Sequence, residues 1–386
     1  MVLQLWERII PTQAQEQLDI TLKELLNKIY KKYAALNEAE QSRILLALHH
    51  SLYLHYGELD KELDMLKRQQ RDTNPHVAKV AKFASKYLES KARLSAGSIE
   101  NIESIQVAGL DALKNALKTV RNLGENGKLK DKINRFGEQT LIADYGAEEA
   151  VIKSLKEAGL PARIISEEHG QIDLVENPTM LVVLDGIDGT AAYIRGERSG
   201  TMLAIFNNTH GKVEDFTYED CVFAGVADIK TGEITHAIKG KGSNILRETG
   251  EIDHANVSTR TELTSEAKVY VDGGEYGMRI NDEVFTDPLK TVTFITPPHN
   301  SGSSAVHYVD LAAGEYDAVC EHTRKGNLEI PTAFLLVTEA GGFMGAVVDG
   351  KLVDLAEQKF WTFGQDKNIP IIAASTKELA NAITEL

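Results

Sequence analysis

The sequence is poor in cysteine, with Cys221 and Cys320 as the only two among 386 residues and no CxxC pair. Two isolated thiols cannot form a disulfide framework, so we expect both to be reduced and buried. The opening stretch MVLQLWERII also lacks the long apolar core of a signal peptide. Both absences favour a reducing, cytoplasmic location.

Long hydrophobic runs and a surplus of basic residues are missing as well. No apolar run reaches the roughly 18 residues that a membrane-spanning helix needs, so no membrane insertion is expected. The formal net charge is −15. Nucleic acid and anionic membranes bind to basic surfaces, so neither is an expected partner. A small phosphorylated metabolite stays compatible with this charge, because bound metal ions reverse the local sign.

The chain length predicts two or three domains, because 386 residues exceed what one compact core usually holds. Residues 1–97 carry 15 Lys and Arg against 12 Asp and Glu, whereas residues 98–386 carry 27 against 45. Apolar residues recur at helical spacing through much of the first segment. We therefore expect a helical N-terminal extension, 1–97, attached to an acidic body.

Beyond Gly124, short apolar runs alternate with helical patterns. The polar, glycine-bounded stretch 124–139 predicts a mobile loop. The runs RIIS, MLVVLD, TMLAIF and VFAGVADI predict strands, and helices are expected at 148–158, 301–314 and 331–340. This mixture predicts a layered α/β fold of the α+β kind.

The segment VVLDGIDGT, residues 182–190, places two aspartates after an apolar run. We expect a buried strand that ends at Asp185, followed by glycines that let the backbone turn tightly. Thr190 is predicted to cap a following helix, whose first N–H groups could receive an anion. Asp185 and Asp188 could share a hard cation beside it, although such a string can also form a plain Asx turn.

Three further segments place acidic residues beside predicted elements. IISEEHG puts Glu167 and Glu168 after a strand, and TLIADYGAEEAVI puts Asp144 just ahead of a helix. NLEIPTAFLLVTEAGG puts Glu329 two residues before Pro331, which suits the first turn of a helix. Together with the two aspartates, these acids favour a metal-assisted phosphate site.

These segments resemble the inositol monophosphatase superfamily of Mg²⁺-dependent, lithium-sensitive phosphatases, which also contains fructose-1,6-bisphosphatases and 3′(2′),5′-bisphosphate nucleotidases. Residues 185–190 are similar to the family motif DPIDGT, and residues 166–168 are similar to GEE. Residues 140–144 resemble TxxD, residues 302–305 resemble GSAA, and residues 328–342 resemble WDxAAG…EAGG. The resemblance runs from about residue 98 to the C-terminus.

The chain departs from these motifs at several positions. Gly186 replaces a proline, Ser166 replaces a glycine, and one extra residue separates Thr140 from Asp144. The WD pair is absent, and Glu329 stands where the monophosphatases have aspartate. The fructose-bisphosphatase branch carries a glutamate there, so metal binding stays plausible while the substrate class is open.

The resemblance implies an αβαβα sandwich of the sugar-phosphatase type with an extra N-terminal helical region. It implies a metal-binding α+β subdomain at 98–255 and an α/β subdomain at 256–386 that completes the active site. It also implies two or three Mg²⁺ per site, with Mn²⁺ as a possible substitute. The implied metal ligands are Glu167, Asp185, the Ile187 carbonyl, Asp188 and Glu329. The implied catalytic residues, which would orient the attacking water, are Asp144, Glu167 and Thr190.

Substrate contacts follow from the same resemblance. The phosphate would meet the N–H groups of Gly189 and Thr190. The other candidates for substrate binding are Gly302, Ser303, Ser304, Glu321, Arg324 and Lys325. A helix cap explains the two serines equally well, and a solvated loop explains the two basic residues.

The sequence thus predicts a Mg²⁺-dependent phosphomonoesterase acting on a small metabolite, such as fructose 1,6-bisphosphate or an inositol monophosphate. A 3′(2′),5′-bisphosphate nucleotidase is one alternative. A non-catalytic regulatory or binding protein on the same fold is another, against which the complete set of acids counts. The resemblance also implies a homo-oligomer, either a dimer or a tetramer.

Overall fold

The computed structural model describes residues 102–134, 136–208, 212–264, 266–271, 293–295, 303–323, 327–365 and 369–385. The predicted helical extension, 1–97, lies outside these residues.

The described strands form two large sheets and one hairpin. The eight-stranded sheet, in the order β10-β9-β8-β7-β6-β5-β3-β4, contains β3 (Ala162–Ser166), β4 (Gly170–Asp173), β5 (Met180–Asp188), β6 (Gly200–Asn207), β7 (Cys221–Asp228), β8 (Ile234–Ile238), β9 (Gly242–Leu246) and β10 (Ile252–Ala255). The six-stranded sheet, in the order β12-β11-β13-β16-β14-β15, contains β11 (Lys268–Val271), β12 (Thr293–Ile295), β13 (Ala318–His322), β14 (Phe343–Val348), β15 (Lys351–Asp354) and β16 (Pro370–Ala374). The hairpin pairs β1 (Lys130–Ile133) with β2 (Gln139–Leu141).

Six α-helices and three short 3₁₀ helices accompany these strands in the described part of the chain. The α-helices are α7 (Ile102–Leu123), α8 (Ile142–Glu157), α9 (Thr190–Ile194), α11 (Ser304–Ala312), α12 (Ile330–Glu339) and α13 (Lys377–Thr384). The 3₁₀ helices are η1 (Gly124–Lys128), η2 (Val213–Asp215) and η3 (Tyr218–Asp220).

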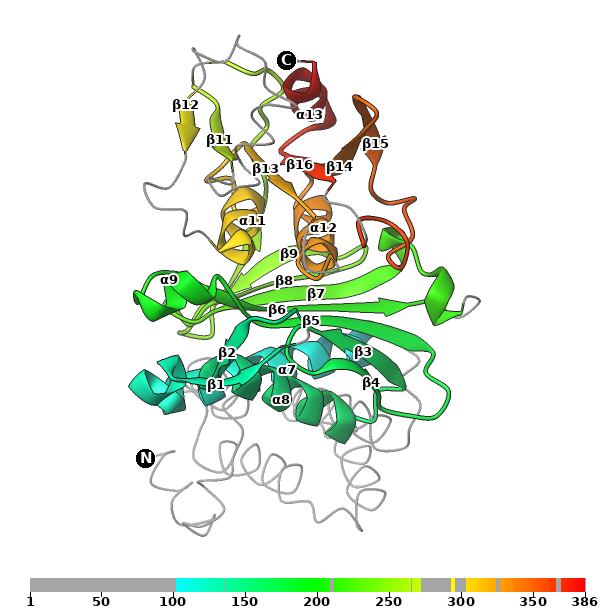
Figure 1. The fold of residues 1–386 in the computed structure, drawn as a ribbon. Coiled ribbons are helices and arrows are strands. Elements are labelled where there is room, and N and C mark those ends of the chain that lie inside the picture. Colours follow the sequence, from blue (N-terminus) through cyan, green and yellow to red (C-terminus); the bar gives the residue numbers. More distant parts are fainter. Residues whose placement is uncertain are drawn as a thin grey trace, which may run out of the picture. The chain divides into compact units, whose positions relative to one another are not determined.

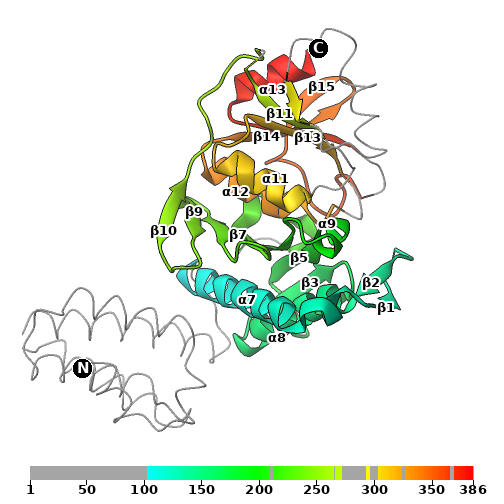
Figure 2. The ribbon, with the colours of Figure 1, turned by 90° about the vertical axis from the view of Figure 1, so that its left-hand side faces the viewer.

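Sheets and helices alternate in five layers (Figure 1). Helices α7 and α8 cover one face of the eight-stranded sheet, and α11 with α12 fill the space between the two sheets. Helix α13 covers the remaining face of the six-stranded sheet, as the second view confirms (Figure 2). The predicted αβαβα sandwich is therefore confirmed.

Strand β5 lies inside the first sheet, parallel to β3 and antiparallel to β6. All nine of its residues are buried, because α8 lies on one face and the α11–α12 layer on the other. A strand covered on both faces carries a continuous apolar run, as MLVVL does, instead of an alternating one. The core thus fixes the strand that leads into the two aspartates.

Helix α7 packs closely against the first sheet. A Cβ atom on Gly109 would lie 2.3 Å from Cε1 of Phe223, and one on Gly225 would lie 2.5 Å from Cδ1 of Leu113. Glycine on both sides of the contact therefore lets the helix approach β7. The buried face of the helix includes Ile105 and Val120, and each large apolar side chain buried in this way contributes about 1.5–3 kcal/mol.

Two sequence predictions require correction. The stretch 124–139 is not a plain loop, because it forms η1 and most of the β1–β2 hairpin. Helix α8 begins at Ile142 and not near residue 148, so Asp144 lies within its first turn. Cys221 and Cys320 are free and buried, as predicted. Within the described ranges, none of the helices combines the length and hydropathy that crossing a bilayer requires.

Candidate metal centre

A β-bulge places the two aspartates of β5 on the same side. Asp185 pairs with Met202 and Asp188 with Gly200, so three steps along β5 match two steps along β6. Residues three apart in a regular strand face opposite sides of a sheet, and one inserted residue reverses that. The predicted end of the strand at Asp185 is therefore wrong, because β5 continues through Asp188. The bulge between the two aspartates brings both side chains to the same face of the sheet.

Asp144 reaches the bulge from the first turn of α8. A Cβ atom on Gly186 would lie 2.4 Å from the backbone oxygen of Asp144 and 2.5 Å from its Oδ1. The glycine at position 186 is thus required by the close approach of α8. The hydroxyl of Thr201 on β6 donates to the Gly186 carbonyl at 2.7 Å, which holds the bulge from the other side.

Glu167 is held at the end of β3 by a residue that sequence reasoning missed. Glu148 is fully buried, and its carboxylate accepts the backbone N–H groups of Glu167 at 3.0 Å and of Glu168 at 3.1 Å. It also accepts the Ser166 hydroxyl at 2.7 Å and lies 2.7 Å from Nδ1 of His169. Glu148 therefore shapes the whole turn that presents Glu167.

One signal in the sequence indicates this role. Glu148 follows Asp144 by four residues, which places both carboxylates on one face of a helix. A second residue that sequence reasoning missed is Asn134, whose amide nitrogen donates to Glu167 at 3.3 Å and to Glu168 at 3.4 Å. The hydroxyl of Thr140 also donates to Glu168.

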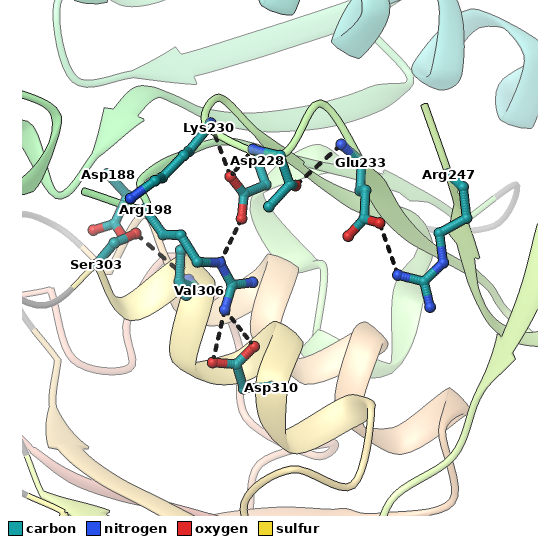
Figure 3. A network of polar contacts seen from close by, with 10 residues as sticks. Asp188, Arg198, Asp228, Lys230, Glu233, Arg247, Ser303, Val306 and Asp310 are labelled. Atoms are coloured by element: carbon teal, nitrogen blue, oxygen red, sulfur yellow. Dashed lines mark hydrogen bonds and ion pairs between the residues drawn. The ribbon is translucent and has the colours of Figure 1, made fainter. Parts of the chain in front are cut away.

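Asp188 is bound by the first turn of α11. Its Oδ2 accepts the Ser303 hydroxyl at 2.5 Å and the Ala305 N–H at 2.7 Å. Ser303 is also the N-cap residue, since its hydroxyl oxygen accepts the Val306 N–H at 3.4 Å. Figure 3 shows Asp188 beside Ser303 at this helix start. These two donors attach the carboxylate of Asp188 to the start of α11.

Glu329 comes from the start of α12, where it is the N-cap residue and is 4% exposed. Pro331 lies in the first turn, as predicted. A backbone N–H at this position has no partner within the helix, so proline costs no hydrogen bond there. The helix ends at Glu339, and Gly341 follows with a φ of 91°. The whole helix is thus placed by signals that the sequence shows.

The structure brings three of the predicted ligands together. One carboxylate oxygen from each of Asp185, Asp188 and Glu329 lies within 4.8 Å of the other two, and all three residues are buried. Burial raises the pKa of Asp185 well above its usual range, and the charges of Glu167 and Asp144 raise it further. Burial likewise raises the pKa of Asp144, with Glu148 and Glu167 adding to the effect.

These clustered, buried carboxylates are suited to binding a metal ion. Oδ1 of Asp144 and Oδ1 of Asp185 are buried, yet neither accepts a hydrogen bond from any described residue. A buried carboxylate oxygen without a donor costs free energy unless a cation or water satisfies it. Carboxylate oxygens are also the ligands that hard divalent cations prefer. The buried acidic cluster can therefore hold a metal ion.

The remaining predicted residues beside β5 lie at the start of α9. Thr190 is not the helix cap, because Gly189 occupies that position with a φ of 80°. The Thr190 hydroxyl instead donates to the Ile187 carbonyl at 3.2 Å. A Cβ atom on Gly189 would lie 2.5 Å from Cβ of Ser303. Gly189 therefore allows both the left-handed turn and the contact with α11.

The predicted substrate residues divide into two groups. The Ser304 hydroxyl donates to Glu321 at 2.8 Å, and the Tyr308 hydroxyl donates to the other oxygen of that carboxylate. Glu321 is 1% exposed and lies on β13, the strand that α11 contacts. The other group, Gly302, Arg324 and Lys325, lies outside the described residues.

Comparison with known proteins finds related phosphatases. The chain is 26% identical over 229 residues to the fructose-1,6-bisphosphatase/inositol-1-monophosphatase of Methanothermobacter thermautotrophicus, covering 57% of this chain and 77% of that protein. It is 27% identical to the bifunctional NADP phosphatase/NAD kinase of Methanococcus maripaludis, covering 55% of this chain and 38% of that protein.

A solved structure shares the fold. It is a hypothetical protein of Pyrococcus horikoshii with similarities to inositol-1 monophosphatase, 23% identical, with a TM-score of 0.54 over 74% of this chain and 98% of that one. The model of the inositol monophosphatase family matches residues 99–386. The curated relatives are named as phosphatases, which agrees with the predicted phosphoric monoester hydrolase. The chain belongs to the inositol monophosphatase family of phosphatases.

Proposed function

We propose that this chain is a Mg²⁺-dependent phosphomonoesterase that hydrolyses a small phosphorylated metabolite. The observation that carries the proposal is the convergence of Asp185, Asp188 and Glu329 within 4.8 Å. Their side chains come from two elements far apart in the sequence, β5 and the start of α12. In a member of this phosphatase family, such a cluster is best explained as the centre that performs hydrolysis.

The proposed metal ligands are Glu167, Asp185, the Ile187 carbonyl, Asp188 and Glu329. They would hold two or three Mg²⁺, with Mn²⁺ as a substitute. When bound, Mg²⁺ neutralises phosphate oxygens and supplies an activated water at neutral pH. The bond from Thr190 leaves Ile187 available, since a carbonyl oxygen has two lone pairs.

The chain's own residues orient the reactants. Asp144, Glu167 and Thr190 would position the attacking water, and the Asp144 Oδ1 is the acceptor that can hold its proton, because no described residue donates to it. The phosphate would meet the backbone N–H groups of Gly189 and Thr190. No covalent phosphoenzyme is needed.

The substrate proposal rests on the names of the curated relatives. One curated relative is named as both a fructose-1,6-bisphosphatase and an inositol-1-monophosphatase, so a sugar phosphate or an inositol monophosphate is the first candidate. The proposed substrate contacts are Gly302, Ser303, Ser304, Glu321, Arg324 and Lys325. Ser303 and Ser304 would act while bonded to Asp188 and Glu321.

A phosphorylated nucleotide is the second candidate. The other curated relative is named as an NADP phosphatase, which favours the predicted alternative of a 3′(2′),5′-bisphosphate nucleotidase or a similar activity. Both candidates use the same carboxylates, and they differ only in what the substrate pocket accepts.

Phosphate release from a panel of substrates tests this proposal. The panel contains inositol 1-phosphate, fructose 1,6-bisphosphate, adenosine 3′,5′-bisphosphate and NADP, each with Mg²⁺ and with EDTA. We expect one compound to be hydrolysed with Mg²⁺ and spared with EDTA, and that compound names the substrate class. Release that EDTA does not change would contradict the metal mechanism. Light scattering on the same sample tests the expected dimer or tetramer.

A further inference from the structure

A partly buried ion-pair network around Arg198 lies close in sequence to the metal centre. Arg198 follows α9 in the segment that leads to β6, two residues before Gly200, the strand partner of Asp188. Its Nε donates to Asp228 at 2.7 Å, and its Nη1 donates to both oxygens of Asp310 at 2.8 and 3.0 Å. Figure 3 shows the guanidinium group between these two carboxylates.

The two partners of Arg198 belong to different layers. Asp228 ends β7, and its other oxygen accepts the N–H groups of Lys230 and Thr231 at 2.9 and 3.0 Å, so it is fixed to the turn after the strand. Asp310 is on α11, in the layer between the sheets. Arg198 therefore ties α11 to the C-terminal end of β7, an interior strand of the first sheet.

Helix α11 has a second attachment to the same sheet. Ser303 and Ala305, at its start, donate to Asp188. Asp310 lies seven positions after Ser303, which is about two helical turns. The helix is thus held at both ends, once by a proposed metal ligand and once by Arg198.

Arg198 separates two carboxylates that would otherwise repel each other. The side chain of Asp228 is 6% exposed and that of Asp310 is 17% exposed, so both carboxylates are poorly hydrated. Without the guanidinium group, two like charges would face each other across the boundary between β7 and α11. Leaving a poorly hydrated charge without its cation is destabilising, and the helix can relieve the repulsion by moving away from the sheet.

We propose that Arg198 is a positioning residue for the metal centre, which acts by holding α11 so that Ser303 and the Ala305 N–H fix the orientation of Asp188. This inference rests on the proposed function, because it concerns the same carboxylates. A displaced α11 leaves Asp188 without its two donors. Metal affinity then falls even though no ligand has been changed, as is typical of residues that orient ligands.

Arg247 provides a matched control. It makes two ion pairs on the same sheet, to Glu233 at 2.7 Å and to Asp253 at 2.8 Å, and its side chain is 38% exposed against 35% for Arg198. Its partners are more exposed and none lies on α11. Exposed ion pairs contribute little, so Arg247→Met should leave Mg²⁺ affinity within about twofold of wild type.

Isothermal calorimetry of Mg²⁺ on the full chain, well below the melting temperature, tests the inference. We expect Arg198→Met and Asp310→Asn each to weaken Mg²⁺ binding by about tenfold. The double variant should bind no more weakly than the worse single variant, because both changes break one bridge. Should Arg198→Met fail to fold, Arg198→Lys replaces it, since one ammonium group cannot bond both carboxylates in the same way.

The outcomes separate the inference from the function on which it rests. Mg²⁺ affinity in Arg198→Met equal to that in Arg247→Met overturns the positioning role, while wild-type binding keeps the proposed function. Wild-type protein that takes up no Mg²⁺ removes the proposed function, and this inference with it. Additive losses in the double variant would also overturn the inference, since Arg198 and Asp310 would then act separately.

Discussion

The hydroxyl of Ser303 donates a hydrogen bond of 2.5 Å to Oδ2 of Asp188. The same hydroxyl oxygen caps α11 by accepting the Val306 N–H. One side chain thus joins the helix layer between the sheets to a carboxylate on β5. The geometry of the acidic cluster therefore depends on how α11 docks.

Replacing Ser303 by alanine separates these two roles. Ser303→Ala should lower the free energy of unfolding by about 1 kcal/mol through the lost cap. It should also weaken Mg²⁺ binding, because Asp188 loses a donor. Thr376→Ala is the control, since Thr376 caps α13 in the same way at 3.2 Å from the Leu379 nitrogen. The melting temperature should fall in both variants. Mg²⁺ affinity reduced equally in both would refute the link to Asp188.

Glu148 is expected to strengthen metal binding by holding the turn that presents Glu167, although Glu148 is not itself a proposed ligand. Glu148→Gln keeps the size of the side chain but replaces one of the two oxygens that accept N–H groups of the turn after β3. Mg²⁺ affinity, measured by calorimetry, should fall by about tenfold. The neighbouring substitution Glu149→Gln alters an exposed residue and should change nothing. Equal affinities in the two variants would show that the turn holds its shape without Glu148.

Gly186 is predicted to tolerate no side chain. The added methyl group of Gly186→Ala would meet the Asp144 backbone oxygen at 2.4 Å, and backbone cannot move as a flexible side chain can. We expect a stability loss of about 1–3 kcal/mol from overpacking and a large loss of phosphate release. Gly146→Ala in α8 is the control, because its nearest neighbours are 3.5 Å away. That variant should be as stable as wild type or more stable. A fully active Gly186→Ala would show that α8 can shift.

A buried histidine predicts how stability depends on pH. Burial lowers the pKa of His236 to about 4, well below its usual value near 6.5. The unfolded chain therefore binds a proton that the folded chain refuses between these two values, so stability is lost as the pH falls from about 6.5 to 4. His236→Gln should reduce this dependence, as measured by denaturant unfolding across the same window. An unchanged pH profile would mean that His236 has the same pKa in the folded and the unfolded chain, which would contradict this account.

The layered fold could be predicted from the sequence because its elements carry local signals. The continuous apolar run of β5 indicates burial on both faces, and Pro331 with Gly341 marks the two ends of α12. The motif acids were found for a similar reason, since each lies at or near the end of an apolar run. Local patterns of this kind need no knowledge of distant contacts.

Other features depend on contacts that no local pattern shows. The bulge between Asp185 and Asp188 exists only in the pairing of β5 with β6. The start of α8 at Ile142 was missed because Asp144 is buried there against Gly186, which a surface pattern does not indicate. Arg198 meets Asp310 across 112 positions of the chain. Such pairs follow from tertiary packing alone.

Calorimetric titration of Mg²⁺ into wild type, Asp188→Asn and Glu149→Gln tests the central claim most directly. The account predicts that wild type and Glu149→Gln bind Mg²⁺ alike, whereas Asp188→Asn loses the binding because one of three converging carboxylates is gone. Undiminished Mg²⁺ binding by Asp188→Asn would contradict the assignment of these carboxylates as the metal centre.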